Sequence, residues 1–175
     1  MSSKASPGFE QAMDCAAAWL RAWVDEEISD EVLADRVAEL VASRDGARGF
    51  FVVALAGDAP LMDRLPDVLV FCLREAGADV VDLSVRNLAM STAMALDHQR
   101  KGDQQQAEGS LRVRRRCLDL LRVLQPGLVK QRLEQLLDGL GDRGEDIRFL
   151  ARWGYDAEQK QAIEAAVLAV VETGH

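Results

Sequence analysis

The chain has 175 residues, of which 49% are hydrophobic, 29% are charged and only 5% are aromatic. This length and composition describe a chain that can bury a core without disulfides and that is not disordered. The net charge of −8 disfavours nonspecific DNA binding. No run of about 18 uncharged apolar residues is present, so the sequence predicts no membrane span. The N-terminus lacks the apolar segment of a signal peptide, and we therefore expect a cytoplasmic protein.

Helix signals follow one another along the first half of the chain. Ser6 and Pro7 predict the start of a first helix, with Ser6 as the N-cap. A second helix is expected to begin near residues 29–30, and the turn at residues 44–46 is expected to end it. A further helix is expected over about residues 67–76.

Residues 49–57 are the main ambiguity, because a short apolar run between glycines can be a buried strand or a buried helix. Residues 78–84 also follow a glycine in a way that suits an α/β unit. The rest of the chain offers no further strands, and a parallel sheet needs several. We therefore predict an all-α fold, a compact multi-helix bundle of about seven to nine helices in a single helical domain, residues 1–175. The alternative is an α/β fold with a small sheet from residues 49–57 and 78–84.

The second half of the chain carries repeated helix-start patterns. Residues 80–100 form a long apolar helix pattern, and Asp103 with Gln106 is a capping-box pattern for the helix that follows. Pro126 restarts the chain into another helix. The same capping pattern occurs twice more, as Asp142 with Glu145 and as Asp156 with Gln159.

A line of polar residues interrupts the apolar helix at residues 80–100. Its members are Ser84, Asn87, Ser91 and His98. A buried polar group costs about 1–3 kcal/mol unless it is hydrogen-bonded, so these side chains need partners. The line is either a seam in which Ser and Thr bond back to their own helix, or a small-molecule site or partner contact.

Residues 100–132 are basic in an otherwise acidic chain, with nine Lys and Arg against three Asp and Glu. Within this segment the arginines expected on one exposed helix face are Arg112, Arg115, Arg116 and Arg122. Arginine suits bidentate contacts with carboxylates and phosphates. The face predicts a site for an acidic protein partner or for a second copy in a homo-oligomer, or else a solvated face neutralised by the chain's own acids. Nucleic acid is disfavoured, because no aromatic residues interleave with the arginines.

Two tryptophans are further candidates for contact. Trp19 and Trp23 lie four apart, so they share one helix face, and they are either a partner-binding hot spot or ordinary core. The aromatic cluster at residues 153–155 is expected to anchor the last helix.

The sequence contains no recognisable catalytic motif. Its two histidines are His98 and the terminal His175, and no nucleophile elbow, P-loop, Rossmann glycine run or zinc signature occurs. The paired carboxylates Glu145 and Asp146 are explained by their position at a helix end. We therefore expect a non-enzymatic protein with no metal and no cofactor.

One stretch resembles proteins of a known kind. Residues 85–94, Val-Arg-Asn-Leu-Ala-Met-Ser-Thr-Ala-Met, followed by His98 and Arg100, resemble uncharacterised helical proteins of cyanobacteria. The resemblance implies a bacterial cytoplasmic setting. It implies no activity, cofactor or catalytic residue.

Overall fold

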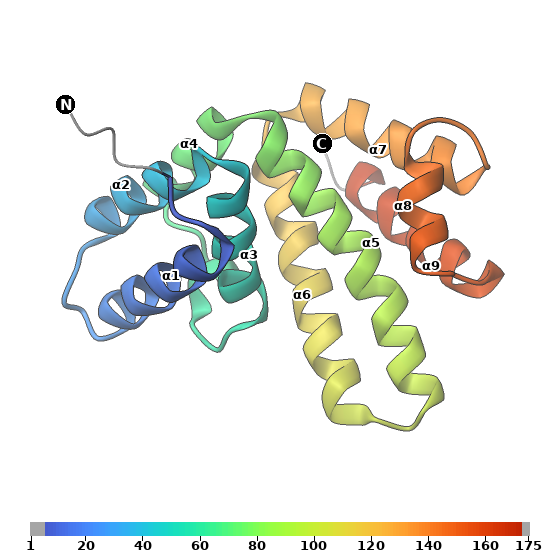
Figure 1. Ribbon diagram of the computed structural model, residues 1–175, viewed down its shortest axis with the longest axis horizontal. Coiled ribbons are helices and arrows are strands. Elements are labelled where there is room, and N and C mark those ends of the chain that lie inside the picture. The colour runs from blue at the N-terminus through green and yellow to red at the C-terminus, as the bar shows by residue number, and fades with distance from the viewer. Residues whose placement is uncertain (1–5, 173–175) are drawn as a thin grey trace. The chain divides into compact units, whose positions relative to one another are not determined.

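The structure is a computed structural model that describes residues 6–172. Within this range the chain forms nine α-helices and one short 3-10 helix, and no strand is present (Figure 1). The predicted all-α class and the expected number of helices are confirmed. The alternative sheet is wrong, because residues 49–56 lie in one helix and residues 78–84 lie in another.

The chain divides into two compact units, which we call the N-terminal unit (residues 1–83) and the C-terminal unit (residues 84–175). The long helix α5 (Ala78–Arg100) contributes its first turns to one unit and the remainder to the other. That the whole chain behaves as a single domain stays a prediction.

Four α-helices and the 3-10 helix make up most of the N-terminal unit. They are α1 (Phe9–Val24), α2 (Asp30–Val41), α3 (Arg44–Ala56), η1 (Pro60–Asp63) and α4 (Asp67–Ala76). Helix α3 packs against α1 and α2, and α2 also packs against α4. The largest side chains buried in this unit are Leu33, Phe50, Phe51, Leu55, Leu61, Met62, Leu69 and Leu73.

Local capping explains where these helices begin. The Ser29 hydroxyl accepts a hydrogen bond from the backbone N–H of Val32 at 3.2 Å, as expected for the N-cap of α2. The first helix differs from expectation: it begins at Phe9, and the carbonyl of Gly8, not Ser6, opens its hydrogen-bond ladder. Residues 44–46 do not end α2 in a turn. They are the first turn of α3, which Ser43 caps.

Helices α1 and α3 approach closely because a glycine lies between them. A Cβ atom placed on Gly49 would lie 2.5 Å from the Cβ of Ala12 and 2.8 Å from the carbonyl oxygen of Phe9. Both distances are far inside van der Waals contact. Ala12 and Ala16 on the facing side of α1 are also fully buried, so small side chains set this spacing.

The C-terminal unit contains the rest of α5 and four further helices. They are α6 (Gln104–Val123), α7 (Pro126–Leu140), α8 (Asp146–Arg152) and α9 (Ala157–Glu172). Helices α5 and α6 form a hairpin, joined by a short turn (Figure 1). Helix α7 packs against α8, and α9 packs against α6 and α7. Buried apolar side chains of this unit include Leu88, Leu120, Leu133, Leu136, Leu150, Ile163 and Val167.

Two of the three expected caps in this unit are confirmed. Asp103 accepts from the backbone N–H of Gln106, and Asp156 and Gln159 bond reciprocally at 2.9 and 3.0 Å. The cap expected at Asp142 is wrong. Asp142 has φ +61° and closes the C-terminus of α7, where the N–H of Arg143 bonds back to the carbonyl of Asp138 at 2.8 Å.

Candidate interaction surfaces

The polar line on α5 is largely buried. Ser84 is 0% exposed and Ser91 is 5% exposed, whereas Asn87 and His98 are partly exposed. The hydroxyls of Ser91 and Thr92 both donate to the carbonyl of Leu88, at 3.2 and 2.7 Å. Such bonds satisfy a hydroxyl within its own helix.

Throughout residues 6–172, no buried side-chain nitrogen or oxygen lacks a hydrogen-bond partner. The buried polar atoms of this line therefore do not need a ligand as a hydrogen-bond partner. The line consists of Ser84, Asn87, Ser91 and His98. Its role as a small-molecule site stays a prediction.

The four arginines of the expected basic face differ in exposure. Arg115 and Arg122 are exposed, and Arg112 is partly exposed. Arg116 is only 2% exposed, so its expected place on an exposed face is wrong. Arg116 lies four residues before Leu120, which is fully buried, so both side chains are on the covered side of α6.

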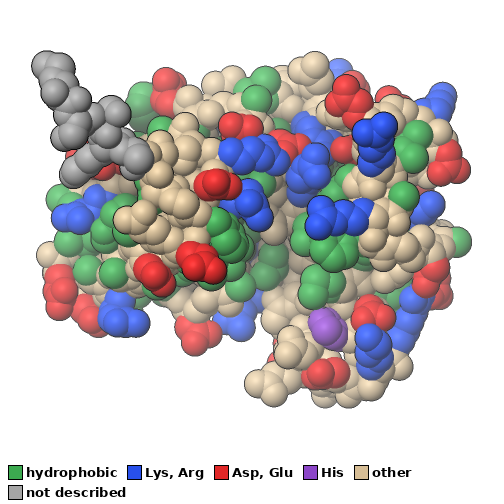
Figure 2. Space-filling model, in the orientation of Figure 1, with side chains coloured by type: hydrophobic (Ala, Val, Ile, Leu, Met, Phe, Trp, Pro, Cys, Tyr) green, Lys and Arg blue, Asp and Glu red, His purple; other side chains and the backbone are tan. Residues whose placement is uncertain are grey.

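Arg122 also has a structural role inside the C-terminal unit. Its guanidinium donates to the Asp119 carboxylate and to the backbone carbonyl of Ala169, both at 3.4 Å. The second bond links α6 to α9. On the face of the molecule in Figure 2, basic and acidic side chains are interspersed. We therefore treat individual arginines, not a broad basic field, as the possible contacts.

The two tryptophans of α1 are both partly exposed, so neither is simply core nor simply surface. The guanidinium carbon of Arg36 lies 5.9 Å from the centre of the Trp19 ring, which it partly covers. The indole N–H of Trp23 donates to Asp30 at 2.7 Å. Trp23 is therefore held in a fixed orientation beside the connection between α1 and α2.

An open groove of about 580 Å³ lies at this connection, and we call it the Trp23 groove. Its lining residues are Trp23, Val24, Glu26, Glu27, Ile28, Ser29, Asp30 and Pro60. Apolar side chains and carboxylates share this lining. The sequence pattern indicated the tryptophan but not the groove, because Pro60 reaches it from a distant part of the chain.

The rings of the C-terminal aromatic cluster differ in exposure, and its role as an anchor of the last helix stays a prediction. Trp153 is 48% exposed, and the guanidinium carbon of Arg152 lies 5.3 Å from its ring centre. Tyr155 is more enclosed, and burial raises the pKa of its hydroxyl to about 12. The cluster thus contributes one enclosed ring and one surface ring.

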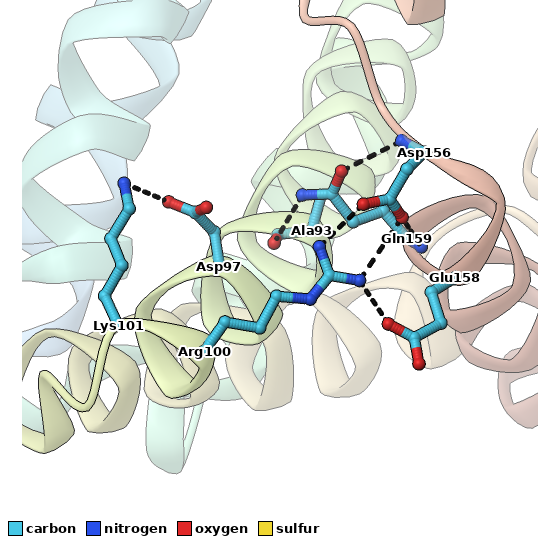
Figure 3. A network of polar contacts seen from close by, with 7 residues as sticks. All are labelled: Ala93, Asp97, Arg100, Lys101, Asp156, Glu158 and Gln159. Atoms are coloured by element: carbon cyan, nitrogen blue, oxygen red, sulfur yellow. Dashed lines mark hydrogen bonds and ion pairs between the residues drawn. The ribbon is translucent and has the colours of Figure 1, made fainter.

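A polar network joins the end of α5 to the start of α9 (Figure 3). Arg100 donates to both carboxylate oxygens of Asp156, at 2.6 and 3.3 Å, and also to Glu158. The Gln159 amide donates to the backbone carbonyl of Ala93 at 3.2 Å. The hydrogen bond from Arg100 is the main cause that lowers the pKa of Asp156 below its ordinary 3.8. Since Arg100 and Ala93 belong to α5 and their partners lie at the start of α9, these bonds join the two helices.

A second ion pair lies within the C-terminal unit and is buried. Arg132 donates to the two oxygens of Asp146 at 2.5 and 3.1 Å, and the two side chains are 10% and 3% exposed. Glu145 and Asp146 do lie at the start of α8, as predicted, but the Asp146 side chain makes this ion pair and caps no backbone N–H. Gly139 permits the approach: a Cβ there would lie 2.7 Å from the Cβ of Asp146.

Chemically reactive groups are few in the described part of the chain. Cys15, Cys72 and Cys117 are free thiols, and burial raises the pKa of Cys117 far above its ordinary value. Residues 6–172 contain no cluster of three or more His, Cys, Asp or Glu side chains placed to hold a metal ion. His175 lies outside the described residues. None of the helices described is both long and apolar enough to cross a membrane.

The fold and these surfaces define an all-helical protein whose notable features are surface arginines and an acidic, aromatic groove. The chain belongs to the family described as uncharacterised conserved protein UCP020893, which matches residues 8–170. The description of this family names no activity. No curated protein and no solved structure matches the chain.

Proposed function

We propose that the protein is a non-enzymatic interaction or regulatory protein that binds an acidic partner protein, or a second copy of itself, through the basic face of α6. The observation that carries the proposal is the placement of Arg115 and Arg122, which are both exposed. They are seven residues apart, which is about two helical turns, so they lie on the same side of α6. Arg112 lies close to the same side.

Charge supports an acidic protein over nucleic acid. The N-terminal unit contains seven basic and sixteen acidic residues, so most of the chain's negative charge lies there. The net negative charge of the chain repels a nucleic acid, whereas a protein can present a small acidic patch to α6 alone. We also propose a bacterial cytoplasmic setting for the protein, on the resemblance of residues 85–94, His98 and Arg100.

The test reverses two charges on α6. We expect the double variant Arg115→Glu/Arg122→Glu to lose partner recovery in a pull-down from the native host, or to lose self-association in sedimentation velocity. Arg116 is left unchanged, because a buried substitution would confound binding with folding. Because Arg122 also donates to the carbonyl of Ala169, circular dichroism must show that the double variant is folded. The matched control is Arg21→Glu/Arg64→Glu, which makes the same change in net charge at two exposed arginines of the N-terminal unit.

Two outcomes would contradict the proposal. One is unchanged partner recovery and unchanged oligomeric state in the α6 variant. The other is binding of duplex DNA at low salt that weakens steeply as salt is added, which would identify nucleic acid as the partner.

A further inference from the structure

We propose that the Trp23 groove is a docking site for a basic linear segment of another protein, one that carries arginine or lysine next to an apolar side chain. This site is separate from the α6 arginines and has the opposite charge. Its occupant follows from three properties of the groove: its lining, its preformed shape and the charge around it.

The lining is amphipathic. Trp23, Val24, Ile28 and Pro60 supply apolar surface, and Val24 is 49% exposed. The carboxylates of Glu26, Glu27 and Asp30 stand beside this surface and are exposed. An apolar side chain of the partner can pack on this apolar surface. A neighbouring Arg or Lys of the partner can then form an ion pair with a carboxylate or a cation–π contact with the indole ring.

Hydrogen bonds within its own lining hold the shape of the groove. The indole N–H of Trp23 is fixed by Asp30, and the connection after α1 is closed by two backbone bonds. The N–H of Glu26 donates to the carbonyl of Trp23 at 3.1 Å, and the N–H of Glu27 donates to the carbonyl of Ala22 at 2.8 Å. Binding therefore does not have to order this loop, which favours recognition of a short segment.

The charge around the groove selects a cation. Residues 23–30, seven of which line the groove, contain four Asp and Glu, all exposed, and no basic residue. Such a surface attracts basic segments and repels nucleic acid, anionic lipid and acidic proteins. A second copy of the chain is a poorer match, since its C-terminal unit contains fourteen basic residues against thirteen acidic ones.

The experiment uses the full chain and three fluorescein-labelled ten-residue peptides in fluorescence anisotropy. The first peptide alternates Arg with Leu, the second has Ser in place of Leu at the same charge, and the third has Glu in place of Arg. We expect the Arg/Leu peptide to bind most tightly and the Glu/Leu peptide not to bind. The substitution Val24→Ser should weaken binding of the Arg/Leu peptide but not of the Arg/Ser peptide, because only the Leu side chains contact the apolar part of the groove.

Matched charge variants separate the groove from the general acidity of the surface. The substitution Glu27→Lys reverses a charge in the groove lining. The control Glu39→Lys makes the same charge change at an exposed position of α2 outside the groove. We expect Glu27→Lys to lower the affinity for the Arg/Leu peptide about tenfold and Glu39→Lys to lower it much less. Equal weakening by both variants, equal binding of the Glu/Leu peptide, or self-association that Glu27→Lys abolishes would each overturn the proposal.

This outcome is independent of the function proposed for α6. The variant Arg115→Glu/Arg122→Glu should bind the Arg/Leu peptide as the wild type does. A result against the proposal for the Trp23 groove can therefore be distinguished from a result against the proposal for α6.

Discussion

The ion pair between Arg132 and Asp146 is the clearest case in which one residue depends on another. Among residues 6–172, Asp146 is the only buried carboxylate, and its partner is a nearly buried arginine. A pair of this kind contributes little net stability, yet removing one partner leaves a charge buried alone. Its importance is therefore expected to appear only when the pair is broken.

We expect Asp146→Ala to lower the free energy of unfolding by about 3–5 kcal/mol, because the buried Arg132 loses the ion pair and both hydrogen bonds that Asp146 makes with it. Urea unfolding followed by circular dichroism measures this. The double variant Arg132→Met/Asp146→Ala removes both charges and should recover much of the loss. A single variant as stable as the wild type would contradict this account of the pair.

Glu26 adopts a backbone conformation that favours glycine, with φ +60° at the residue that closes α1. The left-handed conformation costs an L-residue about 1–2 kcal/mol, a cost that glycine avoids. Glycine, however, loses more backbone entropy on folding, which offsets part of this gain. We expect Glu26→Gly to raise the free energy of unfolding by about 0.5–1 kcal/mol. The same substitution at Asp142, which has φ +61°, should gain less, since Asp tolerates this conformation better. A loss of stability at Glu26→Gly would refute the argument.

At the scale of elements, the spacing of α1 and α3 depends on Gly49. A methyl group there would meet the Cβ of Ala12 and the backbone of α1, so the helices would have to separate. Gly109 in α6 is the natural control, because a Cβ there meets nothing within 4 Å. One glycine is required by packing, and the other is only a weak helix former.

We expect Gly49→Ala to destabilise the protein by about 1–3 kcal/mol through overpacking. We expect Gly109→Ala to stabilise it by about 0.5–1 kcal/mol through better helix propensity. Differential scanning calorimetry of the two variants compares them under the same conditions. Shifts of the same sign in both variants would show that propensity, and not the close approach, decides the effect.

Most of the elements could be predicted from the sequence, because their signals are local. The N-caps at Ser29, Asp103 and Asp156 each depend on a residue only three positions away. Asp142 was misassigned because the same residue type can open one helix or close the preceding one. Only the left-handed backbone of the folded chain distinguishes these roles.

The candidate surfaces were less predictable, because exposure depends on what covers a helix. The spacing of arginines in α6 predicted one shared face, but Arg116 lies one helical turn before Leu120, which is fully buried, and Arg116 is covered on the same side of the helix. Trp23 was identified from its spacing with Trp19. Its groove could not be, because Pro60 lies more than thirty residues away in sequence.

At the scale of the whole molecule, acid should weaken the protein in a way that depends on the network of Figure 3. The folded pKa of Asp156 is below its ordinary 3.8, so the folded state binds fewer protons than the unfolded state around that pH. The stabilisation is therefore present above the unfolded pKa and is lost as the pH falls through the folded one. The pKa of Asp97 is lowered in the same direction, chiefly by its hydrogen bond from Lys101.

We expect Asp156→Asn to be less stable than the wild type near neutral pH and to approach it in acid, below about pH 4. Asparagine keeps the helix cap, so the substitution removes the charge that Arg100 binds while retaining the bond to Gln159. Urea unfolding across this pH range gives the difference. A difference that stays constant with pH would show that the carboxylate charge is not its cause.

Because Cys117 is buried, its reaction with an alkylating reagent can report local unfolding around α6. This thiol is 0% exposed, whereas Cys15 and Cys72 are partly accessible. An alkylating reagent should modify Cys117 only during excursions in which α6 leaves its packed position. In a chain with Cys15 and Cys72 replaced by Ser, the labelling rate would report how often the C-terminal unit opens, and a bound partner that steadies α6 would slow that rate.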